Sequence, residues 1–302
     1  MSITNSTQRN VEAIIIGAAR AGTTTLASYL DTHPNIDFSK EKEVHFFAFD
    51  DLYKKGKKYI NSFFKNNGKI KITADTYLLV DSVAPKRVLE YKPSMKFILI
   101  LREPVSRAFS GYNYSIRNAY IKEGVSFINA CKQEKEFINS EDIVIKNNKC
   151  NLLRSRYFDN LKRWEQFFPK ENFLLLKTHD LHKNPTSVIK QVEKFLNIKS
   201  AEVKLEEKIK NKAFSVRSKF LQQLLVNRNN PIRLFLKKIL PPFVNKFLIK
   251  SGIVVKIANM NKQTKEYAKI TKEEFRFAYK QLEEDILNLK KEYNIDFSEN
   301  EY

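Results

Sequence analysis

A glycine loop between an apolar run and a helix constrains this 302-residue chain more than any other feature. The run Val11–Ile16 is mostly apolar, Gly17 and Gly22 enclose a loop of small residues, and a helix is expected to begin at Thr23. A strand, a glycine loop and a helix N-terminus together bind anions, because free backbone N–H groups and the positive helix end point at the same place. The sequence therefore predicts a phosphate-binding site here.

The loop has the spacing of a Walker A loop but lacks its lysine. Thr23 stands where the lysine that grips the β- and γ-phosphates belongs. Arg20, inside the loop, is the nearest cation. An ordinary ATPase or kinase is therefore disfavoured, and we expect a nucleotide whose 5′ end is not a triphosphate.

Composition narrows the class of protein. The chain carries 54 Lys and Arg against 34 Asp and Glu, a net charge of +20 that would attract polyanions or an acidic membrane. The lysines are nevertheless scattered and form no zinc finger or helix-turn-helix, so no nucleic-acid partner is expected. Cys131 and Cys150 make no disulfide framework and indicate a reducing compartment. Without a signal peptide in the first ten residues or an apolar run of membrane-spanning length, we expect a cytoplasmic protein.

Apolar runs alternate with helical patterns in the first two thirds of the chain. Strands are expected at residues 11–16, 70–74, 96–101 and 172–177, and helices at residues 23–31, 84–91, 104–119 and 156–168. Such alternation predicts an α/β fold with a parallel sheet covered by helices on both faces. The glycine loop would lie at the carboxyl edge of this P-loop NTPase-like sheet.

After about residue 200 the strands are expected to stop. We expect one domain over residues 1–302, with an α/β core at 11–200 and a helical extension at 201–302 packed on it. Helices are expected at residues 215–226 and 271–293. Thr271 and Glu274 fit a capping box at the start of the second of these helices.

The basic segment 231–250 is interrupted by Pro241 and Pro242. Its simplest interpretation is a solvated helical cover with an apolar inner face. A lid over an acceptor site and a contact with a membrane surface are the alternatives.

A second set of anion-binding side chains follows the apolar run 96–101. Arg102 would project from the carboxyl end of that strand, and Arg107 and Ser110 are i,i+3 neighbours on the next helix. A guanidinium and a hydroxyl suit a phosphate monoester. Two anion sites on one sheet edge would fit a nucleotide with phosphates at its 3′ and 5′ ends. The alternative is that Arg102 only pairs with an acidic neighbour.

The third segment, residues 42–47, reads Lys-Glu-Val-His-Phe-Phe. Taken alone, Glu43 is most simply a solvated surface carboxylate, and His45, next to aromatic residues, is a packing histidine.

The three segments together resemble the sulfotransferase family that uses 3′-phosphoadenosine 5′-phosphosulfate (PAPS). Residues 17–24 are similar to its 5′-phosphosulfate loop and residues 102–112 to its 3′-phosphate motif. Residues 42–47 are similar to the segment that carries the catalytic glutamate in heparan-sulfate-type and related bacterial members. The likeness extends over nearly the whole chain. Arg20 departs from the heparan-sulfate type, which usually has a lysine there, and arginine cannot readily give up a proton.

The resemblance implies sulfuryl transfer from PAPS to a hydroxyl or amine, with adenosine 3′,5′-bisphosphate as product and no metal. It implies that Glu43 is the general base, that Arg20 stabilises charge on the leaving oxygen, and that His45 is a second base or a substrate contact. Asp75 and Tyr77 are expected to face the acceptor. The implied cofactor-binding residues are Arg20, Ala21, Gly22, Thr23, Thr24, Arg102, Ser110 and Arg217.

The resemblance also implies a carbohydrate or glycolipid acceptor, and a basic cleft would favour an acidic sugar. The sequence does not indicate an oligomeric state. Two other classes are alternatives. A P-loop-type nucleotide kinase or NTPase would use Asp75 as its magnesium carboxylate. A basic, non-enzymatic polyanion-binding protein would leave Glu43, Arg102 and Ser110 unexplained.

Overall fold

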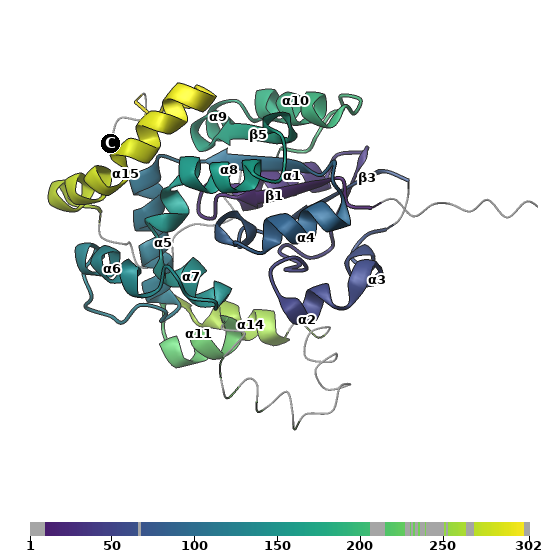
Figure 1. The fold of residues 1–302 in the computed structure, drawn as a ribbon. Helices are drawn as coiled ribbons and strands as arrows, with labels where there is room; N and C mark the ends of the chain where they lie inside the picture. The colour runs from purple at the N-terminus through teal and green to yellow at the C-terminus, as the bar shows by residue number, and fades with distance from the viewer. Residues whose placement is uncertain are drawn as a thin grey trace, which may run out of the picture.

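A five-stranded parallel sheet organises the chain (Figure 1). The computed structural model describes residues 10–65, 68–205, 215–226, 253–263 and 269–298, with a few single positions between 230 and 251. The strands are β1 (Ala13–Gly17), β2 (Ile36–Phe38), β3 (Ile70–Ala74), β4 (Lys96–Leu101) and β5 (Phe173–Lys177). Their order in the sheet is β2-β3-β1-β4-β5, and every neighbouring pair is parallel. The predicted α/β fold is therefore confirmed.

The bounds of β1 and β5 differ by one or two residues from the expected ranges, and the structure contains strands that the sequence analysis did not expect. The sequence analysis missed β2, a three-residue edge strand in which a buried Asp37 interrupts the apolar pattern. Strands also continue beyond residue 200, because β6 (Ser215–Val216) pairs with β7 (Lys262–Gln263) in a small antiparallel sheet. The expected helical C-terminal part is present, but the expectation that strands stop near residue 200 was wrong, since two distant segments form this sheet and neither shows a strand pattern alone.

Helices cover the sheet and extend beyond it. The described α-helices are α1 (Thr23–Asp31), α2 (Asp50–Tyr53), α3 (Gly56–Asn61), α4 (Ala84–Tyr91), α5 (Pro104–Arg117), α6 (Phe127–Gln133), α7 (Ile143–Lys149), α8 (Tyr157–Glu165), α9 (Thr178–Lys183), α10 (Pro185–Leu196), α11 (Lys219–Val226), α14 (Ile253–Met260) and α15 (Lys272–Tyr293). The predicted bounds of α1 and α4 are confirmed, and α5, α8 and α11 are shorter than expected. Pro104 occupies the first turn of α5, as predicted, and the Glu103 carboxylate caps that turn by accepting from Val105 N and Ser106 N.

The last helix, α15, packs on the α/β core beside α5, α6 and α8 (Figure 1). Ala278 and Leu282 of α15 are fully buried in a cluster with Val105 and Ala108 of α5. Asp285 of α15 accepts hydrogen bonds from two backbone N–H groups at the start of α8, at 3.1 and 2.9 Å. The predicted capping box of Thr271 and Glu274 is present. Packing and hydrogen bonds thus hold the C-terminal helix on the core.

Segment 231–250 lies almost wholly outside the described residues. Among the residues that are described, no helix has both the length and the apolar character needed to cross a membrane. Cys131 and Cys150 are buried free thiols, in agreement with the predicted lack of a disulfide framework.

Truncation of Leu282 tests the docking of α15. Leu282→Ala should lower the free energy of unfolding by about 2–5 kcal/mol, because it leaves a cavity in a fully buried cluster. Leu287→Ala, on the exposed side of the same helix, should change it by less than about 0.5 kcal/mol. Urea unfolding followed by circular dichroism measures both. Equal effects would contradict the described packing of α15.

Candidate active site

The glycine loop joins the carboxyl end of the central strand β1 to the first turn of α1. Gly22 precedes α1 with a φ of 101°, in the left-handed region that glycine adopts without strain. Within the described part of the chain no side chain caps the N-terminus of α1, and its first turn has no acidic residue. The first N–H groups of this helix have no partner within it, so the predicted anion-binding arrangement is present.

Buried side chains from other elements hold the loop in place. The Arg107 guanidinium donates to the carbonyl of Ala19 at 2.9 Å and to that of Asn151 at 2.8 Å. The Thr178 hydroxyl donates to the carbonyl of Ala21. Burial lowers the pKa of Arg107 to about 9, so the side chain stays charged at neutral pH. The proposed phosphate contact of Arg107 is therefore corrected: this arginine is fully buried and binds the loop from behind.

The two predicted phosphate-binding segments meet at Arg20 and Ser110. Arg20 Nε lies 3.3 Å from Ser110 Oγ, and its guanidinium carbon lies 5.4 Å from the centre of the Tyr114 ring. Arg102 directly follows β4 and is half-buried. Its side chain makes no hydrogen bond or ion pair with the rest of the described chain. The glycine loop, the residue after β4 and α5 thus present Arg20, Arg102 and the Ser110 hydroxyl at the carboxyl edge of the sheet.

Glu43 lies beside the same loop, in a network of donors. Its Oε1 accepts from the Thr76 hydroxyl at 2.6 Å and lies 3.7 Å from the Lys42 ammonium. That ammonium also reaches the Thr23 hydroxyl in the first turn of α1, at 3.4 Å. Burial favours the neutral carboxyl, but Lys42, His45 and Thr76 together outweigh burial and lower the pKa of Glu43 below its ordinary value. Glu43 is therefore ionised at neutral pH and able to accept a proton.

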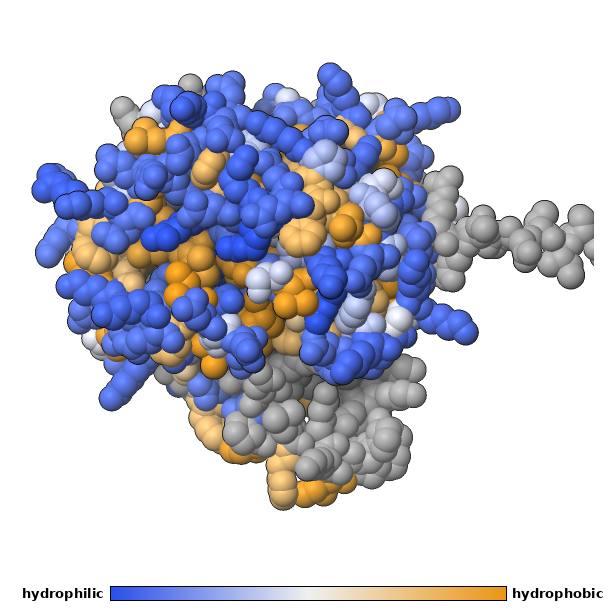
Figure 2. All heavy atoms as spheres, in the orientation of Figure 1, coloured by the Kyte–Doolittle hydropathy of each residue, from blue (hydrophilic) through white to orange (hydrophobic). Residues whose placement is uncertain are grey.

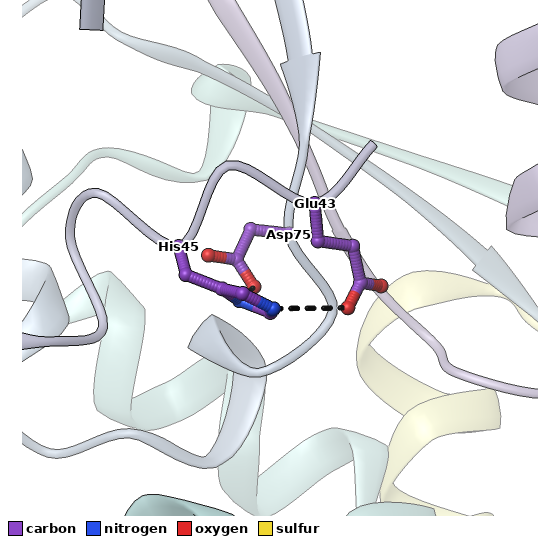
Figure 3. Close-up of side chains that lie close together, drawn as sticks. All are labelled: Glu43, His45 and Asp75. Atoms are coloured by element: carbon purple, nitrogen blue, oxygen red, sulfur yellow. Dashed lines mark hydrogen bonds and ion pairs between the residues drawn. The ribbon is translucent and has the colours of Figure 1, made fainter. Parts of the chain in front are cut away.

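His45 lies between two carboxylates (Figure 3). Its Nδ1 is 3.1 Å from Asp75 Oδ1, and its Nε2 is 3.9 Å from Glu43 Oε2. Because a carboxylate oxygen only accepts, a protonated His45 donates from Nδ1 to Asp75 and turns its Nε2–H toward Glu43, and it is this charged form that lowers the pKa of Glu43. The neutral form keeps its proton on Nδ1. His45 also packs against Phe49 and Tyr77, so the same imidazole has both aromatic packing contacts and polar contacts. Asp75 is buried behind His45.

Glu43, His45 and Asp75 are also a set of side chains that could bind a metal ion. One ligand atom from each lies within 4.8 Å of the others. Asp75 Oδ2 is buried and has no hydrogen-bond partner in the described part of the chain. The Lys42 ammonium beside Glu43 would repel a cation, however. His45 Nδ1 and Asp75 Oδ1 are already hydrogen-bonded to each other and so are not free to bind a metal. The contacts therefore fit a proton-handling set better than a metal site.

Glu43 lines a cavity of about 220 Å³ together with Lys42 and with Arg20, Thr23 and Thr24 of the glycine loop and α1. The lining does not include His45, Asp75, Arg102 or Ser110. The charged lining residues are Glu43 and three cations, Arg20, Lys42 and Arg154. The Arg154 guanidinium is buried and donates to the carbonyls of Asn147 and Thr76. The cavity is therefore positive overall, which suits an anion.

Tyr77 lines the cavity, and burial raises its pKa to about 12, so its hydroxyl remains protonated. The sequence analysis did not identify the other residues of this wall, because single polar side chains from separate segments carry no local signal of a shared cavity. These lining residues are Thr76, Tyr114, Ser115, Asn147, Asn148 and Arg154.

Arg217 is exposed directly after β6 and is not among the residues that line this cavity.

A second, wider cavity of about 810 Å³ adjoins Phe49. Its lining contains two cations, Arg87 and Lys146, and five carboxylates, so the expected basic cleft is not found in this groove. The carboxylates belong to Asp50, Asp51, Asp81, Glu141 and Asp142.

Comparison with known proteins agrees with this geometry. The family model of the sulfotransferase domain matches residues 11–232. Mouse heparan sulfate glucosamine 3-O-sulfotransferase 5 is 30% identical over 201 residues, which cover 63% of this chain and 54% of that protein. The bifunctional heparan sulfate N-deacetylase/N-sulfotransferase 1 of Caenorhabditis elegans is 24% identical over 200 residues, 64% of this chain and 23% of that protein. This chain thus spans about half the length of the first relative and less of the second.

A sulfotransferase from Alicyclobacillus acidocaldarius has a similar solved structure. The TM-score is 0.54 at 23% identity, and the match covers 68% of this chain and 87% of that one. This likeness supports the fold.

The role of Asp75 in orienting His45 can be tested directly. In the unaltered protein, long-range proton–nitrogen NMR spectra should show neutral His45 protonated on Nδ1. Asp75→Asn should shift the tautomer toward protonation on Nε2, because an amide can donate to Nδ1 where a carboxylate cannot. Asp180→Asn, which alters the exposed His179 pair, is the matched control and should leave His45 unchanged. An unaltered His45 tautomer in Asp75→Asn would contradict this orienting role.

Proposed function

The chain belongs to the sulfotransferase domain family, and we propose that it transfers a sulfuryl group from PAPS to a hydroxyl or amine of a carbohydrate acceptor. The observation that carries this proposal is the shared cavity. An ionised carboxylate on Glu43 and an uncapped helix N-terminus with Arg20 lie on its walls. A base for the acceptor and a cradle for an anionic donor thus meet at one place.

The residues around the glycine loop fit a nucleotide with charged groups at both ends. The 5′-phosphosulfate would lie at the N-terminus of α1, against the backbone N–H groups of residues 21–24, the hydroxyls of Thr23 and Thr24, and Arg20. Arg102 and Ser110 would hold the 3′-phosphate. Arg102, Ser110 and Arg217 all lie outside the lining of the cavity. Ser110 contacts the lining residue Arg20, and Arg102 directly follows the neighbouring strand β4, whereas Arg217 is exposed after β6 and is proposed from the resemblance alone.

Bound PAPS would supply the sulfuryl group and a phosphate leaving group. The acceptor O–H bond breaks as its oxygen bonds to sulfur and the sulfur–oxygen bond to the phosphate breaks. Glu43 takes the acceptor proton, and His45, oriented by Asp75, turns Nε2 toward Glu43. Arg20 and Lys42 balance the charge on the phosphate oxygen. We propose that these cations make a metal unnecessary.

The acceptor proposal rests on the relatives and on the space beside the cavity. Two relatives are named for sulfation in heparan sulfate, which makes a carbohydrate, including a glycolipid headgroup, the proposed acceptor class. Phe49 contacts His45 and also lines the wider groove, so that groove offers room for the rest of the acceptor. A P-loop kinase is disfavoured because Thr23 replaces the lysine, and a purely polyanion-binding role leaves the Glu43 network unused.

Transfer from radiolabelled PAPS tests this function. Incubation with a panel of saccharides and glycolipids should give a labelled product, with activity unchanged by a chelator. Glu43→Gln should lower turnover by at least about 100-fold, since the base is lost, while adenosine 3′,5′-bisphosphate still binds. The matched control is Glu41→Gln, an exposed carboxylate two residues away that should retain activity. Full activity in Glu43→Gln would rule out Glu43 as the base.

Binding of two adenosine nucleotides tests the role of Arg102. Arg102→Ala should weaken binding of adenosine 3′,5′-bisphosphate by about tenfold or more, because a charge-assisted hydrogen bond is lost. Binding of adenosine 5′-phosphate, which lacks the 3′ group, should change little. Isothermal titration calorimetry measures both. An equal loss for the two nucleotides would assign Arg102 a role other than 3′-phosphate recognition.

A further inference from the structure

Helix α11 presents its polar side chains to the protein and an aromatic ring to the outside. Gln222 is buried, and its Nε2 donates to Asn118 Oδ1 at 2.8 Å, at the end of α5. Gln223 Nε2 donates to the carbonyl of Ala119 at 2.9 Å. Phe220 is 64% exposed. A surface helix ordinarily has the reverse arrangement, with its apolar stripe against the core.

Helix α14, which contacts α11, repeats this inversion. Asn261 at its end is buried and donates to the carbonyl of Ser218, whereas Met260 is 67% exposed. Four of the ten exposed large apolar residues in the described chain lie on α11 and α14, and we call them the outer apolar face. They are Phe220, Ile253, Ile257 and Met260. Figure 2 shows apolar side chains over α11 at the lower edge of the molecule. Such a concentration marks an interaction surface.

The charge of residues 208–265 indicates which kind of partner the outer apolar face would bind. The expectation of scattered basic residues was wrong here: residues 208–265 contain fourteen Lys and Arg residues and no Asp or Glu, a charge of +14 of the net +20. A second copy of the chain would bring a second uncompensated positive charge and be repelled. Nucleic acid is bound through phosphates and stacked bases, which leaves exposed isoleucine and methionine without a role.

We propose that the outer apolar face docks on a membrane that contains acidic lipids. Basic residues next to apolar side chains are the combination that binds at an anionic membrane surface, with the apolar groups in the acyl boundary and the cations at the headgroups. Docking does not depend on the proposed sulfuryl transfer. Because α11 is bonded to the end of α5, and Gly111 and Tyr114 of α5 line the cavity, docking would hold that cavity close to the lipid surface.

Vesicle sedimentation with the full chain tests the proposal. The protein should bind vesicles of phosphatidylglycerol and phosphatidylcholine and should not bind vesicles of phosphatidylcholine alone. The double variant Phe220→Ser, Met260→Ser should bind the acidic vesicles at least about tenfold more weakly, because two apolar side chains no longer enter the membrane. The matched control is the double variant Val83→Ser, Leu287→Ser, which alters two exposed apolar side chains elsewhere and should bind like the unaltered protein.

Thermal unfolding checks that both double variants fold. Equal vesicle binding by the two variants would overturn the proposal, as would an unaltered protein that does not bind acidic vesicles. A dimer in sedimentation velocity that the Phe220→Ser, Met260→Ser variant abolishes, together with no vesicle binding, would show that a second copy covers the face instead.

Discussion

The buried guanidinium of Arg107 is the interaction on which the site depends. It joins the carbonyl of Ala19 in the glycine loop to the carbonyl of Asn151, 132 residues later in the chain. A buried charge is costly unless it is hydrogen-bonded, and Nε and Nη1 of Arg107 bond these carbonyls while Nη2 is buried without a partner in the described chain. The loop and the segment around Asn151 must therefore keep one geometry together. Arg154, further along that segment, donates to the carbonyl of Thr76, and the Thr76 hydroxyl in turn donates to Glu43. One buried cation thus aligns both walls of the cavity.

The charges in the cavity have complementary tasks. Arg20, Lys42 and Arg154 make it attractive to an anion, and Lys42 also keeps Glu43 ionised despite burial. An anion would compete with Glu43 for Lys42, because the Lys42 ammonium lies between that carboxylate and the Thr23 hydroxyl. Glu43 and the N-terminus of α1 are therefore electrostatically linked through one side chain.

Local patterns predicted most of the fold and part of the site. The runs that form β3 and β4 and the loop around Gly22 are strong signals, because strand burial and positive φ each demand particular residues. The burial of Arg107 could not be predicted, since an i,i+3 spacing does not say which face of a helix meets the core. Asn147 and Asn148 of α7 form part of the cavity wall but belong to no recognisable motif. They reach the cavity only because α7 packs on α5, a contact that the sequence does not reveal. For segment 42–47 the sequence allowed two interpretations of His45, a polar site residue and a packing histidine. In the structure His45 has both kinds of contact, with Asp75 and with two aromatic rings.

The hydrogen bond between Arg20 and Ser110 has a consequence for ligand recognition. Arg20 has a φ of 72° and is held by α5 and by the Tyr114 ring. Its conformational entropy is therefore lost when the chain folds, and little remains to be lost when an anion arrives. The site is preorganised: its selectivity for a ligand follows from a shape fixed in advance, and a ligand that needs Arg20 elsewhere must first break this bond.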